Sequence, residues 1–260
     1  MLIDLTDKVA IVTGGGRGIG REIARTLASE GVVTVVTDIR ADLLAEVTTE
    51  WEDKGWRGGQ LVCDVRKPED CRSVAETVER DFGRIDILVN NAGVASGDPV
   101  ADLKEEDWDR NLDINLKGTM LMCQAVIPAM KRQGVGRILN ASSFAAIIPS
   151  IGGAAYAASK AGVASLTRVL AGELGASGIT VNAYAPGMIP TEMNHFAEHE
   201  SEVQERLLDT LSLRRWGDPV DVANLICFLA SDQAAYITGA LIDVSGGKFA
   251  TQMPWMAYRG

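Results

Sequence analysis

Short apolar runs rich in valine and isoleucine alternate with longer segments of helical periodicity along almost the whole chain. The short runs are continuously apolar, which is typical of strands that are buried on both faces of a parallel sheet. Each pair of parallel strands needs a crossover connection, and helical crossovers cover the two faces of the sheet. The pattern therefore predicts an α/β protein with a doubly wound, about seven-stranded parallel sheet and helices on both faces.

The periodicity also places the individual elements. Strands are expected over residues 8–13, 32–37, 60–65, 85–90, 137–141, 179–184 and 241–244. Helices are expected over residues 18–30, 41–53, 68–82, 105–132, 153–174 and 220–230. Only Pro190 to Asp218 has no clear helix or strand pattern, and a loop of that length is usually a functional lid or disordered. Since no linker or repeat divides the chain, residues 1–260 are expected to form a single domain.

Composition excludes several classes of protein. The chain has 260 residues, of which 47% are hydrophobic, and a net charge of −10 with a pI of about 4.8. Nucleic-acid binding is disfavoured, because it depends on Lys and Arg at phosphates. No apolar run approaches the ~18 residues of a membrane span, and the N-terminus lacks a signal-peptide pattern. The four scattered cysteines, Cys63, Cys71, Cys123 and Cys227, predict buried, reduced thiols in a cytoplasmic protein.

A glycine-rich segment with the pattern T-G-x-x-x-G-x-G follows the first expected strand and opens the first expected helix. Glycines let the backbone turn tightly and approach a pyrophosphate, and the helix N-terminus attracts negative charge. The segment therefore predicts a dinucleotide site in a Rossmann-like fold. The expected contacts come from Gly14, Gly16, Arg17, Gly18, Ile19 and Gly20.

An acidic residue, Asp38, ends the second expected strand. At this point of a dinucleotide-binding fold, an acid accepts hydrogen bonds from the ribose hydroxyls and repels a 2′-phosphate. NAD is therefore favoured as the cofactor. Arg17 and Arg40 leave NADP open, because either guanidinium could bind a phosphate.

Tyr156 and Lys160 are four residues apart in an alanine-rich helical segment, so their side chains face the same way. An ammonium near a phenol favours the phenolate and lowers a pKa that starts near ~10. The tyrosine is therefore a candidate proton donor and acceptor. On its own the spacing equally fits a solvated lysine beside a packed ring.

With the glycine pattern, this pair resembles the classical short-chain dehydrogenase/reductase family, over about residues 8–247. The resemblance implies that Asp64-Val65 hold the adenine and that Asn90-Asn91-Ala92-Gly93 stabilise the sheet and border the adenine ribose. It also implies that Pro186-Gly187-Met188-Ile189-Pro190-Thr191 contacts the nicotinamide carboxamide. The cofactor residues it adds are Asp64, Val65, Asn91, Ala92, Gly93, Pro186, Gly187, Ile189 and Thr191, together with Tyr156 and Lys160.

The resemblance further implies hydride transfer at an alcohol carbon. Tyr156 exchanges the hydroxyl proton, and Lys160 lowers the tyrosine pKa and binds the nicotinamide ribose. Ser143, thirteen residues before the tyrosine, holds the substrate oxygen, with Ser142 as the weaker candidate. Asn115 completes a proton relay through a water on its backbone carbonyl. Substrate is expected to contact Ser143 and Tyr156.

Two rival functions are possible on the residues alone. His195-Phe-Ala-Glu-His199 matches the zinc-protease pattern H-x-x-E-H, but it lies in the segment least suited to a rigid metal site, so no metal is expected. A catalytically silent, cofactor-binding regulator is the second rival. It is disfavoured because both the tyrosine and the lysine are present.

The substrate pocket is expected to involve residues 94–99, 144–153 and 188–213, which are mostly apolar and include the bulkier Met188, Met193 and Phe196. Such a pocket suits small secondary alcohols, ketones, hydroxy acids or steroids. The alternative is an NADP-dependent 3-oxoacyl (acyl-carrier-protein) reductase. Ser177 stands where such reductases often have an arginine, and an acidic chain repels an acidic carrier, so a small free substrate is favoured.

The resemblance also implies a homotetramer. Residues 188–218 are expected to form the substrate lid. The C-terminal tail, residues 248–260, carries Met253, Trp255, Met256 and Tyr258, and exposed apolar clusters usually mark an interface. We expect the tail to pack on a neighbouring subunit, close to that subunit's active site.

Overall fold

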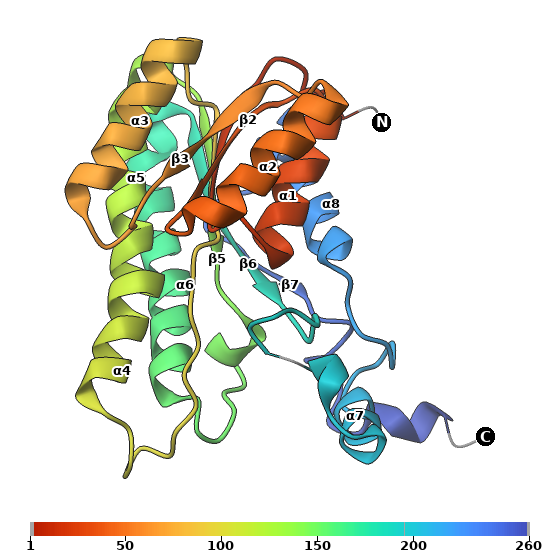
Figure 1. Cartoon of the computed structure of the whole chain (residues 1–260). Helices are drawn as coiled ribbons and strands as arrows, with labels where there is room; N and C mark the ends of the chain where they lie inside the picture. Colours follow the sequence, from red (N-terminus) through yellow and green to blue (C-terminus); the bar gives the residue numbers. More distant parts are fainter. Residues whose placement is uncertain (1–2, 195, 259–260) are drawn as a thin grey trace.

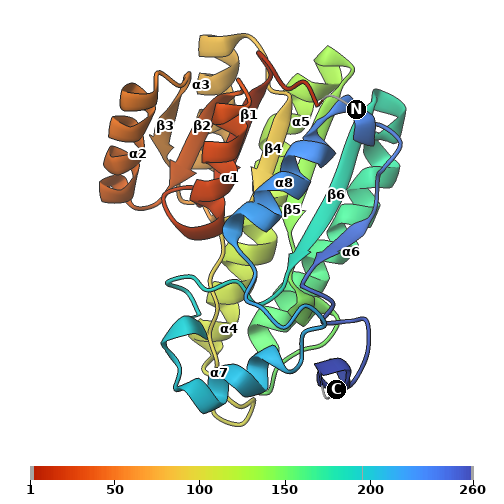
Figure 2. The same cartoon turned by 90° about the vertical axis from the view of Figure 1, so that its right-hand side faces the viewer.

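A seven-stranded, fully parallel sheet lies between two layers of helices in the computed structural model, which describes residues 3–194 and 196–258 (Figure 1). The strands are β1 (Val9–Thr13), β2 (Val33–Asp38), β3 (Gly58–Val62), β4 (Ile87–Asn90), β5 (Gly136–Ala141), β6 (Ile179–Pro186) and β7 (Leu241–Val244). They follow the order β3-β2-β1-β4-β5-β6-β7 (Figure 2), so the predicted doubly wound fold is confirmed.

Helices cover both faces of the sheet. One face carries α1 (Gly18–Ser29), α2 (Ala41–Lys54) and α8 (Pro219–Ala230), and the other carries α3 (Pro68–Phe82), α5 (Gly118–Gln133) and α6 (Ala154–Leu174) (Figure 1). The short helices α4 (Glu105–Asn111) and α7 (Ser201–Leu208) lie beyond the carboxyl ends of the strands.

The strands supply two hydrophobic cores, one on each face. In β1, Ala10 and Val12 pack into the core under α1 and α8, while Val9 and Ile11 pack into the core under α3 and α5. Side chains of a strand point alternately to the two faces, so a strand buried on both faces must be apolar throughout. Each buried Val or Ile stabilises the fold by about 1.5–3 kcal/mol.

The strand order reverses direction at β1. The chain runs outward from β1 through β2 to β3, then returns to pair β4 on the other side of β1 and continues to β7. The loops that follow β1 and β4 therefore separate and leave a crevice at the carboxyl ends of these strands, where ligands of doubly wound sheets bind.

The third strand runs over Gly58–Val62 instead of the predicted residues 60–65. Gly58 and Gly59 pair with Thr34 and Val35 of β2, although glycines predict a turn. A Cβ at Gly58 would lie 2.0 Å from the carbonyl oxygen of Thr34, so the close pairing requires glycine. Asp64 and Val65 lie in the turn after β3, where the Asp70 carboxylate accepts a hydrogen bond from the Asp64 N–H.

The long helix predicted over residues 105–132 is interrupted. The π-helical segment Leu112–Lys117 joins α4 to α5, and it contains Asn115. Such segments are rare, and those that occur are often found at functional sites.

The segment without a predicted identity contains a short 3₁₀ helix, Phe196–Glu198, and α7. A capping box of Asp218 and Asp221 then starts α8. After β7 the chain folds back toward this segment, and the Tyr258 hydroxyl donates a hydrogen bond to the carbonyl of Ser212 at 2.7 Å.

Candidate active site

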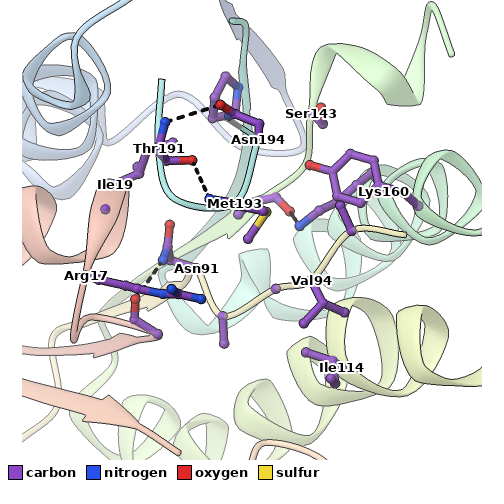
Figure 3. A pocket seen from close by; sticks show the side chains of 18 of the residues that line it. Arg17, Ile19, Asn91, Val94, Ile114, Ser143, Lys160, Thr191, Met193 and Asn194 are labelled. Atoms are coloured by element: carbon purple, nitrogen blue, oxygen red, sulfur yellow. Dashed lines mark hydrogen bonds between the residues drawn. The ribbon is translucent and has the colours of Figure 1, made fainter. Parts of the chain in front are cut away.

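A cavity of about 570 Å³ occupies the crevice at the carboxyl ends of the strands. Its walls come from the glycine segment, from the ends of β2, β4, β5 and β6, from α6, and from the expected lid segment, residues 188–218. Figure 3 shows Arg17 and Ile19 on one side of the cavity and Ser143 and Lys160 on the other. Of the predicted site residues, Gly14, Arg17, Gly18, Ile19, Asp38, Asp64, Val65, Asn91, Ala92, Gly93, Ser143, Tyr156, Lys160, Pro186, Gly187, Ile189 and Thr191 all line it.

The glycine segment packs so closely on the loop after β4 that side chains do not fit. Gly14 has a φ of +61°, and a Cβ there would lie 2.7 Å from the Cα of Ala92. A Cβ at Gly20 would lie 2.3 Å from the carbonyl oxygen of Gly14 and 2.4 Å from Asn91 Nδ2. The helix N-terminus that follows fits the pyrophosphate of a dinucleotide.

The loop after β4 is tied to the end of β1. Thr13 Oγ1 accepts hydrogen bonds from the N–H groups of Asn91 and Ala92 at 3.0 and 3.1 Å, and Asn91 Nδ2 donates to the carbonyl of Gly14 at 3.2 Å. From β6, the Tyr184 hydroxyl donates to Asn91 Oδ1 at 3.4 Å. These bonds link the ends of three strands into a preformed floor.

The corner at the end of β2 carries several charges. Asp38 Oδ2 accepts from the Gly16 N–H at 3.2 Å, and Oδ1 accepts from the Arg40 N–H at 3.0 Å. The Arg40 guanidinium pairs with Asp42, and Arg17 Nη1 lies 2.7 Å from Glu192 Oε2. Both arginines that could have bound a phosphate therefore already hold carboxylates.

Asp64 has a partner that the sequence did not reveal. The Arg66 guanidinium donates to both Asp64 carboxylate oxygens, at 2.6 to 3.1 Å, and holds the pKa of that carboxyl below its usual range. Arg66 itself lines the cavity. At the opposite end of the cleft, Gly187 follows β6, and its N–H donates to the carbonyl of Val244 in β7.

Tyr156, Lys160 and Ser143 lie together at the end of the cavity nearest α6. The Lys160 ammonium is buried, donates to the carbonyl of Ala141 at 2.8 Å and lies 5.7 Å from the centre of the Tyr156 ring. Ser143 lies close enough to Tyr156 for its side chain to influence the tyrosine hydroxyl, and its Oγ accepts from the Ala145 N–H at 3.1 Å. Ser142 points away, since its Oγ donates to the carbonyl of Lys160.

The pKa of Tyr156 moves opposite to the expectation. Burial raises the pKa of Tyr156, and the Ser143 side chain opposes this rise. Lys160 does not offset the burial, because its ammonium is directed at the Ala141 carbonyl and lies beside the ring. Burial also lowers the pKa of Lys160, to about 8, because no carboxylate lies within ion-pair distance of its ammonium among the described residues.

Three predicted residues lie behind the cavity wall. The fully buried Asn115 exchanges two hydrogen bonds with the backbone of Val94, at 2.8 and 2.9 Å, and donates a third to Ser159 Oγ. Its backbone carbonyl accepts from Thr119 Oγ1 at 2.8 Å. Gly16 binds Asp38 and Gly20 packs under Gly14, so all three support residues that do line the cavity.

Several lining residues were not predicted, and part of each predicted pocket segment lies outside the cavity. Tyr184, Arg66, Arg110 and Ile114 line the cavity. Of these, only Tyr184 had a visible signal, as the one aromatic residue within a strand of small and aliphatic side chains. Met193 and Phe196 line the cavity as expected. Met188 does not, because it is buried and borders a second, smaller cavity of about 290 Å³ near Val244.

No group of three His, Cys, Asp or Glu side chains suited to a metal is found within residues 3–194 and 196–258. His195 of the H-x-x-E-H pattern lies outside the described residues, so the absence of a metal stays a prediction. The four cysteines are buried and free. Where the structure is described, no helix combines the length and the apolarity needed to cross a bilayer.

Comparison with known proteins agrees with this geometry. The family model described as enoyl-(acyl carrier protein) reductase matches residues 14–248. A 3-oxoacyl-[acyl-carrier-protein] reductase of Staphylococcus epidermidis is 41% identical over 94% of this chain and 99% of the relative. Human dehydrogenase/reductase SDR family member 4 is 40% identical over 94% of this chain and 88% of the relative.

Among solved structures, levodione reductase matches with a TM-score of 0.89 and 32% identity, over 95% of this chain and 99% of that one. The family model covers nearly the whole chain, and the relatives match it almost end to end. The chain therefore belongs to the classical short-chain dehydrogenase/reductase family of oxidoreductases.

Proposed function

We propose that this protein is an NAD-dependent dehydrogenase/reductase of a small secondary alcohol and its ketone, with Tyr156 as the general acid and base. One observation carries the proposal. A single cavity has the tyrosine, serine and lysine at one end and the glycine segment with Asp38 at the other. When bound, a nicotinamide cofactor supplies the hydride chemistry.

The residues of the chain supply orientation and proton transfer. Tyr156 takes the alcohol proton during oxidation and returns it during reduction. Ser143, which lies beside Tyr156, holds the substrate oxygen where charge develops. Lys160 is the buried cation beside the tyrosine ring and would hold the nicotinamide ribose. Asn115 fixes the Val94 backbone in the facing wall, which supports a positioning role in addition to the relay that the resemblance implies.

NAD is the proposed cofactor because of the charges at the end of β2. Asp38 is oriented by two backbone N–H groups, and neither Arg17 nor Arg40 is free of a carboxylate partner. A 2′-phosphate would meet the Asp38 carboxylate, whereas ribose hydroxyls would donate hydrogen bonds to it.

The alternative substrate is a 3-oxoacyl group on an acyl carrier protein, because relatives that are 41% identical have that name. The net charge of −10 disfavours an acidic carrier. Ser177 is weaker support than expected. It lies just before β6 begins, at the edge of the sheet opposite this subunit's own cavity, so it says little about docking at that cavity.

The deciding experiment is a turnover screen. Small secondary alcohols and ketones, and 3-oxoacyl thioesters with and without the carrier protein, are each assayed with NAD(H) and NADP(H). We expect the highest kcat/KM with a free small substrate and NAD(H). Turnover confined to carrier-bound thioesters with NADPH would establish the alternative.

We also propose that the protein is a homotetramer with residues 188–218 as its lid. No strand of the described residues pairs with the outer edge of β7, and Val169 of the long helix α6 and Trp108 of the short helix α4 are exposed large apolar side chains. Met253 and Met256 of the tail are exposed too, which supports its contact with a neighbour. Light scattering of the full chain tests the tetramer, and light scattering of a chain truncated after Gly247 tests the tail contact. An unchanged tetramer with full activity after truncation would rule out the tail contact.

A further inference from the structure

We propose that Glu192, on the lid, is a second acidic determinant of cofactor choice that acts with Asp38 to exclude a 2′-phosphate. The inference rests on the proposed NAD dependence and assigns part of it to a residue outside the Rossmann core. It would make cofactor selectivity a property of the lid as well as of the end of β2.

Glu192 reaches the cofactor end of the cavity although it belongs to the lid. Its Oε2 lies 2.7 Å from Arg17 Nη1, on the glycine segment. Its charge also interacts with the Arg40 guanidinium, which pairs directly with Asp42. Arg17, Arg40 and Glu192 all line the same cavity as Asp38.

The lid presents Glu192 through a defined turn. Asn194 Nδ2 donates to the carbonyl of Ile189 at 2.8 Å, and Asn194 Oδ1 accepts from the Thr191 N–H at 3.2 Å. Thr191 itself faces the glycine segment, since a Cβ at Gly18 would lie 3.7 Å from its Cγ2. Figure 3 shows this turn, with Thr191, Met193 and Asn194, on the cavity side of the lid.

The charge balance at this corner disfavours a further anion. Arg17 and Arg40 contribute two positive charges, while Asp38, Asp42 and Glu192 contribute three negative charges. A 2′-phosphate would add about 1.5 to 2 negative charges, and it could recruit Arg17 only by displacing Glu192. The ribose hydroxyls of NAD add no charge at this corner. Glu192 therefore disfavours only the cofactor that has a 2′-phosphate.

The test uses two probes that differ only in the 2′-phosphate, namely adenosine 5′-monophosphate and adenosine 2′,5′-bisphosphate. Calorimetry gives the Kd of each for the wild-type chain and for Glu192→Gln. We expect the variant to bind the bisphosphate about tenfold more tightly, with the monophosphate Kd unchanged within about twofold. The gain should shrink at high salt, because both partners are partly exposed.

Glu200→Gln is the matched control. It makes the same charge change on the same lid, at the exposed N-terminus of α7. An equal gain in this control would show a general charge effect and would overturn the assignment to Glu192. In Glu192→Gln combined with Arg17→Gln the gain should disappear, because the released guanidinium is the group that binds the phosphate.

The two proposals fail differently. If Asp38→Ser shifts the preference toward the bisphosphate and Glu192→Gln does not, NAD dependence stands and the role of Glu192 is wrong. If the wild-type chain already binds the bisphosphate more tightly than the monophosphate, both are wrong.

Discussion

The two ends of the cavity are built in different ways. The cofactor end consists of strand ends and backbone, with Thr13, Asn91 and Gly14 joined by hydrogen bonds. The substrate end consists of the loop after β5 and the lid, where Ile147, Ile151 and Met193 are 54%, 103% and 47% exposed. The first end is preformed by hydrogen bonds between strand ends, whereas the second leaves large apolar side chains exposed. The comparison suggests that changes at the two ends should affect different kinetic constants.

The most severe test is Tyr156→Phe, which removes only the hydroxyl. We expect turnover to fall by about 10²–10⁴-fold, the range for loss of a general acid and base, while NAD affinity stays nearly unchanged. Stopped-flow turnover and fluorescence titration of the cofactor measure the two effects separately. More than a few per cent of wild-type turnover would contradict the role of this hydroxyl.

Ser143→Ala sharpens the description of the catalytic end. The Ser143 side chain opposes the rise in the Tyr156 pKa that burial causes, so its removal should raise that pKa further. Alcohol oxidation needs the deprotonated tyrosine, so its rate should reach half-maximum at a higher pH. We also expect kcat to fall by about 10²-fold.

The pH–rate profile of alcohol oxidation is the measurement. Ser142→Ala is its control, because the Ser142 hydroxyl bonds the carbonyl of Lys160 and does not face Tyr156. The control should leave the pH dependence in place. A Ser143→Ala profile that overlays the wild-type one would remove Ser143 from contact with the reacting proton.

Gly14→Ala tests whether the cofactor end is as rigid as its contacts indicate. The added Cβ would lie 2.7 Å from the Cα of Ala92, at a φ of +61°. We expect a loss of about 1–3 kcal/mol in the free energy of unfolding and at least a tenfold weaker NAD affinity. Urea denaturation and cofactor titration give both values.

The matched control is Gly172→Ala. Gly172 lies inside α6, and nothing comes within 4 Å of the position of its Cβ. Alanine there should stabilise the protein by about 0.5–1 kcal/mol. Equal destabilisation by the two changes would mean that the packing under the glycine segment is not special.

Phe196→Ala addresses the substrate end and should have the smallest effect. Phe196 lines the cavity and stacks on Trp216, with ring centroids 5.8 Å apart. Its loss should raise the substrate KM by about tenfold, because truncating an aromatic side chain removes roughly 1–2 kcal/mol of binding free energy. The NAD Kd should stay unchanged. A matching rise in the NAD Kd would show that the two ends are coupled through the lid.

The sequence predicted the cofactor end better than the substrate end for a physical reason. A glycine turn, an acid after a strand and a Tyr/Lys pair are local patterns, and parallel strands bring their carboxyl ends to one edge of the sheet. The lid has no such rule. Glu192 meets Arg17 across 175 positions of sequence, and no local pattern indicates that contact.

Three other differences have local causes that periodicity does not reveal. Glycines in β3 are required by the Thr34 backbone, so the strand begins earlier than predicted. The Lys160 ammonium bonds the Ala141 carbonyl, so the expected lowering of the Tyr156 pKa does not follow from helical spacing alone. The lid contains α7, whose 8 residues are fewer than the about 11–18 residues over which helical periodicity is judged.

The π-helical segment Leu112–Lys117 determines how α4 is rotated relative to α5 within one nearly continuous helix. Successive α-helical residues are rotated by about 100° about the helix axis, so an additional residue within one turn rotates the side chains before it relative to those after it. Upstream, this rotation fixes the direction of Arg110 on the cavity wall; downstream, Met122 and Val126 stay in the core. The segment fixes the orientation of the binding surface on α4 relative to the packing surface on α5. Residues of either surface could therefore change during evolution without altering that relative orientation.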